Sequence, residues 1–360
     1  MDKNYSENPN TQGNNDNDMY GCRKNWLEGV KRHFSNVGFA YFIFFLVYYG
    51  VQMFMGVFAN GLFSAGVIKI ENKELAAVVL FALQFVPTYI ISFPVLYTLV
   101  RKIKVTPVKQ AHMTASGLTT TVVIVGFLMY GGNIVGRMLM EFISIIMGTT
   151  LSNSVDQLAS GGNFLAVAIF AVILAPVFEE MCFRKILLDR TLVYGERNAV
   201  ILSALSFGLF HANLYQFFYA FLIGVVFAYI YTRTGKIRYS IGFHMAVNFT
   251  GSIIPMLVMK NLDMEKLASK DPAVVLEQIQ TPGFKIYMVY VCCILAVFIA
   301  GLVSFIRVMR NKTISLDANG APMTKEEGKN VTYKNIGMSL FIGICIATTI
   351  LLMVAQAIVV

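Results

Sequence analysis

Apolar runs of about 18 residues or more recur along the whole sequence, and they constrain the fold more than any other feature. Each run is long enough to cross the hydrocarbon core of a bilayer, which is about 30 Å thick. Helices of soluble proteins are usually amphipathic, so a soluble domain would not hide so many continuous apolar runs. The sequence therefore predicts an integral membrane protein that crosses the bilayer many times.

The predicted fold is all-α, a polytopic transmembrane helix bundle, because helices satisfy all their backbone hydrogen bonds within one segment in lipid. About nine spans are expected, at residues 36–58, 75–100, 113–134, 163–186, 198–213, 214–232, 239–259, 285–306 and 335–357. Residues 1–35 are polar and rich in Asn, and we expect a disordered cytoplasmic tail there. Residues 36–360 then form the transmembrane helical domain.

The formal net charge is +9, but only 14% of the residues are charged and the basic ones lie between apolar segments. In such positions Lys and Arg set the orientation in the membrane, so the charge does not indicate a nucleic-acid partner. Most of them fall on the inner side if the N-terminus is cytoplasmic. We therefore predict a multi-pass protein of the cell membrane with a cytoplasmic N-terminus and an external C-terminus.

Three groups of polar side chains lie within the predicted spans. They are Glu179, Glu180 and Arg184 in EEMCFR, His211 in FGLFH, and His244 with Asn248 in HMAVN. An ionisable residue at membrane depth is costly, and it marks a candidate functional site. Single polar residues can also hold helices together. Three groups in successive helices favour the functional interpretation.

Helix geometry predicts which of these residues pair with each other and which face the site. Glu180 and Arg184 are four residues apart, so they share a helix face and can form an ion pair. His244 and Asn248 have the same spacing and can face one cavity. Glu179 lies about 100° around the helix from Glu180 and is expected to face the site.

This set of side chains suits hydrolysis. A Glu can accept a proton from water, and a His can orient that water. A second His and an Asn can donate hydrogen bonds to the oxyanion of a tetrahedral intermediate. Zinc also accepts His and carboxylate ligands, so Glu179, His211 and His244 are candidate zinc ligands. The sequence leaves both possibilities open, no cofactor or one zinc ion.

Another charged pair, Arg137 and Glu141, lies four residues apart in an apolar stretch. We predict a structural ion pair, because pairing is the usual way to tolerate charge at membrane depth. The alternative is that this pair gates the site.

The three motifs together resemble those of the CAAX-processing and bacteriocin-processing family of intramembrane proteases, which includes type II CAAX prenyl endopeptidases. EEMCFR is similar to the family's EExxxR motif, FGLFH to FxxxH and HMAVN to HxxxN. The resemblance covers residues 160–256, the expected protease core. A single EExxxR is weak evidence, whereas three motifs in register are specific.

The resemblance implies a role for each motif residue. Glu179 corresponds to the base that activates water together with His211, and His244 and Asn248 to the groups that stabilise the oxyanion. Supporting roles fall to Glu180, Arg184 and Phe207. The family is described both as metalloproteases and as metal-free, glutamate-dependent enzymes. The sequence lacks the HExxH motif of zincins.

The expected activity is hydrolysis of a peptide bond in a partner protein or peptide that is embedded in the bilayer or anchored to it by a lipid. The alternative is a non-catalytic membrane scaffold or a bacteriocin-immunity protein with the same fold. A transporter is disfavoured, because transporters usually contain repeated halves, and the sequence has no internal repeat.

Overall fold

The computed structural model describes residues 16–151, 153, 163–312, 314, 316 and 323–359. All regular elements in this part of the chain are helical, so the predicted all-α fold is confirmed. The elements are α1 (Asp16–Ser64), α2 (Lys73–Val100), α3 (Ala115–Met147), α5 (Phe164–Ala166), η2 (Val167–Leu174), α6 (Ala175–Glu180), η3 (Met181–Leu188), α7 (Asp189–Thr191), η4 (Leu192–Tyr194), α8 (Glu196–Phe210), α9 (Leu214–Thr234), α10 (Ile237–Asn248), η5 (Phe249–Ile253), α11 (Ile254–Met259), α12 (Met264–Leu267), α13 (Pro272–Gln280), α14 (Pro282–Arg310), α15 (Lys325–Tyr333) and α16 (Ile336–Val359).

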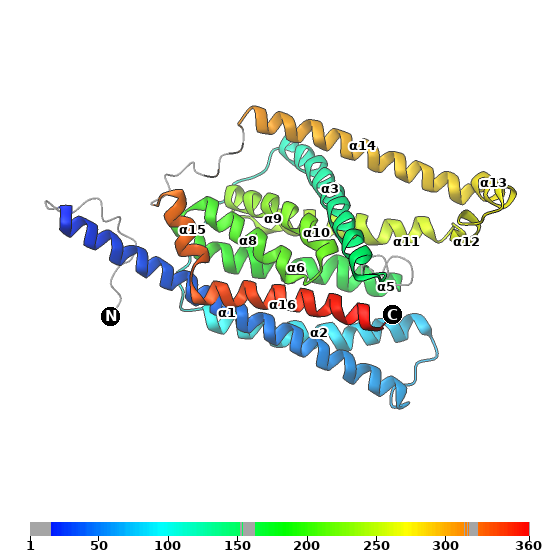
Figure 1. Cartoon of the computed structure of the whole chain (residues 1–360), viewed down its shortest axis with the longest axis horizontal. Helices are drawn as coiled ribbons and strands as arrows, with labels where there is room; N and C mark the ends of the chain where they lie inside the picture. Colours follow the sequence, from blue (N-terminus) through cyan, green and yellow to red (C-terminus); the bar gives the residue numbers. More distant parts are fainter. Residues whose placement is uncertain are drawn as a thin grey trace.

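Eight helices of the described residues are long and apolar enough to cross a membrane, one fewer than the nine spans expected. The difference is α8, which has 15 residues and is therefore only about 22 Å long. It lies next to α9 inside the bundle (Figure 1) and is largely buried by protein. A helix in that position need not match the thickness of the bilayer, because protein rather than lipid surrounds it.

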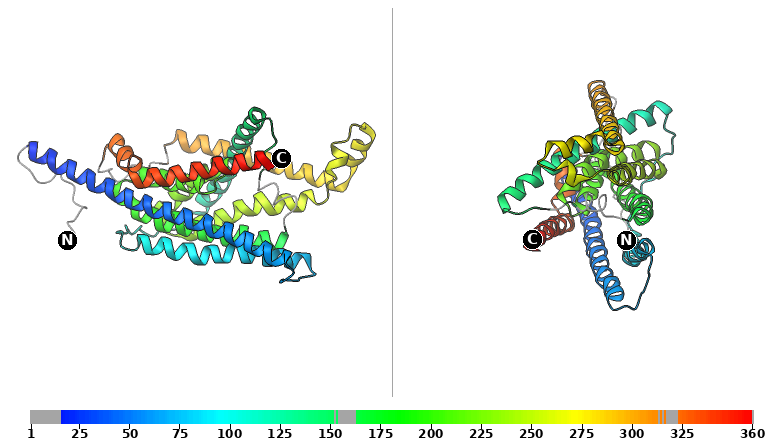
Figure 2. Two further views of the ribbon diagram at one scale, coloured as in Figure 1. Left: turned by 60° about the horizontal axis from the view of Figure 1, so that its bottom comes forward. Right: turned by 90° about the vertical axis from the view of Figure 1, so that its right-hand side faces the viewer.

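The helices form layers with the motif helices in the middle. Figures 1 and 2 show α8, α9 and α10 between α14 on one side and the pair α1 and α2 on the other. The helix α3 packs on both α9 and α14, and two glycines permit these close contacts. A Cβ atom at Gly132 would overlap the backbone of Tyr219, and one at Gly301 would overlap the carbonyl oxygen of Val123. Small residues at such crossings let membrane helices approach closely.

The first helix begins at Asp16, so the expected disorder is wrong for residues 16–35. Residues 1–15 lie outside the described part. Trp26, Val30 and Phe34 recur at intervals of four residues, and all three are buried. This apolar stripe packs α1 against the rest of the bundle, which explains why the helix extends beyond the apolar run.

Two tyrosines of α1 connect this helix to the motif helices. The hydroxyl of Tyr41 donates a hydrogen bond to the carbonyl oxygen of Cys182 at 2.5 Å, and the hydroxyl of Tyr49 donates to that of Phe210 at 2.6 Å. Buried polar groups need such partners, since an unpaired one in an apolar interior is costly. These bonds position η3 and the end of α8 relative to α1.

Candidate active site

The first motif lies where a regular helix changes to a wider one. Glu179 and Glu180 are the last residues of α6, and Arg184 lies in the π-helical segment η3. Another π-helical segment, η5, directly follows Asn248 at the end of α10. Such segments interrupt α-helices frequently at functional sites. Both motif helices therefore depart from regular geometry next to their polar residues.

Glu180 forms a fully buried network with Arg184 and His244. Its Oε2 lies 3.1 Å from the Nε of Arg184, and neither side chain is exposed. Its Oε1 lies 3.0 Å from the Nδ1 of His244. The predicted pairing of Glu180 with Arg184 is thus found, and the contact with His244 adds a link that the spacing did not predict. A carboxylate on one ring nitrogen sets the orientation of an imidazole.

Glu179 approaches the same imidazole from its other nitrogen. Its Oε2 lies 3.7 Å from the Nε2 of His244, and its side chain is 12% exposed, whereas that of Glu180 is fully buried. Within the described residues this oxygen has no hydrogen-bond partner. The ring of His244 therefore lies between Glu180, whose Oε2 is ion-paired with Arg184, and Glu179, whose Oε2 has no hydrogen-bond partner among the described residues.

Phe207 brings the two motif histidines together. The ring of His211 lies 5.1 Å from that of Phe207, and the ring of His244 lies 5.3 Å from it, both edge to face. The guanidinium of Arg184 lies 4.5 Å from the same ring. Such contacts between a cation and an aromatic face stabilise a charge that is removed from water.

His211 is at the end of a helix rather than within a span. It caps the C-terminus of α8, and Ala212 follows with a positive φ of 47°. Asn213 then caps α9 by accepting a hydrogen bond from the backbone N–H of Tyr215. Left-handed backbone is uncommon outside glycine, and such strain occurs preferentially at functional sites. The tight turn holds His211 at the rim of the buried network.

Asn248 connects α10 to η2. Its Nδ2 donates a hydrogen bond to the carbonyl oxygen of Ala171 at 2.8 Å. The side chain is half-buried and lies one turn beyond His244. One of its two amide hydrogens is therefore engaged, and the carboxamide is held in a defined orientation.

Aromatic side chains of α1 and α2 surround the residue before Glu179, a feature that the motifs did not indicate. The ring of Tyr89 lies 4.4 Å from that of Phe178, and the ring of Tyr48 lies 6.0 Å from it. Phe44 stacks on Phe210 at 5.2 Å nearby. Aromatic residues recur every three or four positions in α1. This spacing is the sequence signal that could have revealed the aromatic side chains around Phe178.

The candidate zinc ligands Glu179, His211 and His244 do not form a metal-binding group in this arrangement. Among the described residues, no three His, Cys, Asp or Glu side chains converge as such a group. The Nδ1 of His244 is also occupied by Glu180. The residues present thus do not fit a zinc ion in this geometry.

The expected ion pair between Arg137 and Glu141 is not found among the described residues, so this prediction is wrong. The Nε of Arg137 instead donates a hydrogen bond to the Oδ1 of Asn133 at 2.8 Å, one turn earlier in α3. A neutral partner on the same helix satisfies part of the guanidinium at little conformational cost.

Comparison with known proteins supports the resemblance that the motifs predicted. The family described as type II CAAX prenyl endopeptidase Rce1-like matches residues 161–250, the segment that contains all three motifs. The protein "Putative membrane peptidase YdiL" of Bacillus subtilis (strain 168) is 31% identical over 96 residues. The match covers 26% of this chain and 38% of that relative. No solved structure matches the chain.

The predicted family resemblance is confirmed for residues 161–250. The remaining helices, including the whole of α1, α2, α3, α14 and α16, lie outside the matched segment. The matched segment thus forms the middle layer of the bundle, and the other helices cover it.

Proposed function

We propose that this chain is an intramembrane endopeptidase that hydrolyses a peptide bond of a membrane-anchored or lipidated protein or peptide. The observation that carries the proposal is the free oxygen of Glu179 beside His244. A buried carboxylate oxygen without a partner is costly unless it serves a ligand or a reaction. The match to a peptidase family over the same residues supports this assignment.

In the proposed mechanism, Glu179 accepts a proton from a water molecule as the water oxygen attacks the carbonyl carbon of the substrate. His211 orients this water from the rim of the site. The protonated Glu179 then gives the proton to the leaving nitrogen as the carbon–nitrogen bond breaks. The products are a carboxylic acid and an amine, and the second proton of the water then passes from the acid to the amine, so the reaction is balanced without any further reactant.

The oxyanion of the tetrahedral intermediate is assigned to His244 and Asn248. Because Glu180 occupies the Nδ1 of His244, the Nε2 is the nitrogen that faces the reacting groups. It donates a hydrogen bond to the oxyanion when the imidazole is protonated, and the carboxylate of Glu180 stabilises that charge. Arg184 and Phe207 keep Glu180 and the two rings in place.

Cleavage by purified protein in lipid vesicles tests this proposal. Peptides with a lipid or transmembrane anchor are compared with the same peptides lacking it, and mass spectrometry identifies the products. We expect the wild type to cleave anchored peptides and Glu179→Gln to leave them intact. The absence of cleavage by wild type across anchored peptide libraries would favour the non-catalytic scaffold or immunity protein.

We further propose that activity does not require tightly bound zinc. Asn248 is a poor zinc ligand, and its position beside His244 suits hydrogen-bond donation. A chelator should therefore leave the cleavage rate unchanged. Elemental analysis that finds one zinc per chain in active protein, lost together with activity on chelation, would refute this.

The orientation that the basic residues predict remains part of the proposal. We count the short helix α8 as a ninth crossing beside the eight longer helices, and we therefore place the N-terminus in the cytoplasm and the C-terminus outside the cell membrane. Reporter proteins fused after residues 110 and 236 should be cytoplasmic, and a fusion after residue 270 should be external. An external signal at 236 would overturn the placement of the motif helices.

A further inference from the structure

A cavity of about 830 Å³ lies far along the chain from the motif residues, where α1 meets the junction of α15 and α16. One wall is a single face of α1, formed by Glu28, Lys31, Arg32 and Ser35. The other wall is formed by residues 333–336 and the first turns of α16. The cavity therefore lies at the end of the bundle where the apolar parts of α1 and α16 begin.

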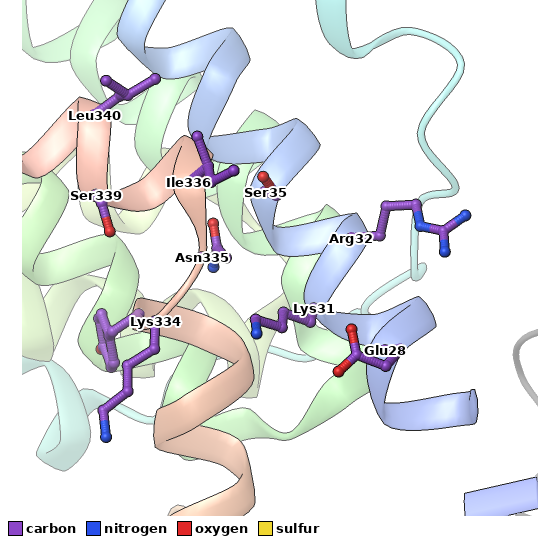
Figure 3. Close-up of a pocket in the computed structure, with 10 residues that line it drawn as sticks. Glu28, Lys31, Arg32, Ser35, Lys334, Asn335, Ile336, Ser339 and Leu340 are labelled. Atoms are coloured by element: carbon purple, nitrogen blue, oxygen red, sulfur yellow. The ribbon is translucent and has the colours of Figure 1, made fainter. Parts of the chain in front are cut away.

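The cavity carries an excess of positive charge. Lys31, Arg32 and Lys334 line it, and Glu28 is its one acidic side chain. None of these three basic residues forms an ion pair within the described part of the chain. Figure 3 shows Lys31 extending from α1 toward the opposite wall and Arg32 at the outer side of α1. Lys31 and Lys334 on the two walls, with Arg32 on α1 beside them, give the cavity a positive charge that suits an anion.

The lining changes from charged to apolar along the direction of the helices. In Figure 3 the side chains of Lys31 and Lys334 lie toward one end, whereas Ile336 and Leu340 lie toward the other. Ile336 is 73% exposed and Leu340 is 39% exposed. The buried hydroxyl of Tyr333, which also lines the cavity, has no hydrogen-bond partner among the described residues.

We propose that this cavity binds the headgroup of an anionic phospholipid, with the acyl chains along the apolar side of α16. Basic pockets between membrane helices bind anionic headgroups, and each Lys or Arg near the surface adds to the attraction. Lys31 extends toward the phosphate from α1, Lys334 adds positive charge at the opposite wall, and Tyr333 can donate a further hydrogen bond. The adjoining apolar side chains favour a lipid over a soluble anion, because a soluble anion would leave them in water.

Lipid binding to the full chain in a neutral detergent tests the proposal. Phosphatidylglycerol is titrated against phosphatidylcholine, with thermal unfolding and native mass spectrometry as readouts. We expect phosphatidylglycerol alone to bind and to raise the melting temperature. Each removed cation should weaken binding about fivefold, so the triple variant Lys31→Gln, Arg32→Gln, Lys334→Gln should bind about 100-fold less tightly.

The matched control is Lys312→Gln, Lys325→Gln, Lys329→Gln, which removes three exposed cations near the same end of the bundle but outside the cavity. It should bind phosphatidylglycerol like the wild type. Equal losses in both triple variants would overturn the site.

A second variant keeps the proposal testable if the triple variant does not fold. Glu28 is exposed, and Glu28→Gln removes the only negative charge of the cavity. This change should tighten phosphatidylglycerol binding about fivefold. Unchanged affinity would contradict the proposal. Equal stabilisation by inorganic phosphate would assign the cavity to soluble anions instead.

Discussion

The motif helices and the helix α14 differ in where their charged and apolar side chains lie. In the motif helices, Glu180 and Arg184 are fully buried and paired with each other. In α14, the charged residues lie only near the ends, and apolar side chains such as Val289 and Ile299 are more than half exposed. Charge at membrane depth requires partners, whereas a lipid-facing surface requires only apolar side chains. Substitutions in the two regions should therefore have very different effects.

The largest expected effect is the loss of activity in Glu179→Gln. Glutamine has nearly the same shape but cannot accept the proton, so kcat should fall about 10²- to 10⁴-fold. The melting temperature should stay close to that of the wild type, because Glu179 is not the partner of Arg184. The matched control Glu277→Gln makes the same chemical change in exposed α13 and should retain full activity. Full activity in Glu179→Gln would remove it from the mechanism.

The next effect is the loss of stability in Glu180→Gln. This change leaves the buried guanidinium of Arg184 without a countercharge and weakens the link to His244. Breaking a buried ion pair in this way costs about 3–5 kcal/mol. Thermal unfolding in detergent and the yield of folded protein measure it.

The double variant Glu180→Gln, Arg184→Met separates the ion pair from the orientation of His244. Because it removes both charges, it should regain most of the lost stability. Its cleavage rate should nevertheless stay below that of the wild type, because His244 lacks the carboxylate of Glu180 that orients it. A stable, inactive Glu180→Gln beside an active Glu179→Gln would show that the two roles are exchanged.

A smaller effect is expected from two glycine substitutions, one beside the motif helices and one in α14. Gly132→Ala forces α3 away from Tyr219 in the middle layer, and Gly301→Ala forces α14 away from α3. Overpacking of this kind costs about 1–3 kcal/mol in either place. Only Gly132→Ala should also lower kcat/KM, because α9 adjoins the motif residues. A similar loss of kcat/KM in both variants would mean that α14 takes part in the site.

The smallest effect concerns the ion pair between Arg23 and Glu327, which joins α1 to α15 at 2.8 Å. The hydrogen bond from Arg23 lowers the pKa of Glu327 below its ordinary value. Its contribution to stability is therefore present above the ordinary pKa and is lost as the pH falls through the lowered one. Both side chains are partly exposed, so Arg23→Gln should cost less than about 1 kcal/mol. Melting curves of the wild type and of Arg23→Gln at neutral and acidic pH measure this loss of stability. A larger loss of stability at acidic pH than at neutral pH would contradict the prediction.

Local sequence patterns predicted the parts of the molecule that depend on one helix at a time. The apolar runs predicted the helical bundle, and the four-residue spacing predicted the pairing of Glu180 with Arg184. The same reasoning counted α8 as a full span, although this helix has only 15 residues and is largely buried inside the bundle. It also failed for Arg137, where Asn133 at the same spacing offers a competing partner.

The sequence alone determined that the chain lies in the membrane, that its charges at depth are few, and which polar residues are candidates for catalysis. These properties follow from composition and from the helical repeat, which act over one or two turns. Only the tertiary structure decided that Glu180 also contacts His244, and that the ring of Phe207 packs against His244. Those contacts join helices that are far apart in the chain, and their geometry depends on how the helices cross and on the π-helical segments beside them.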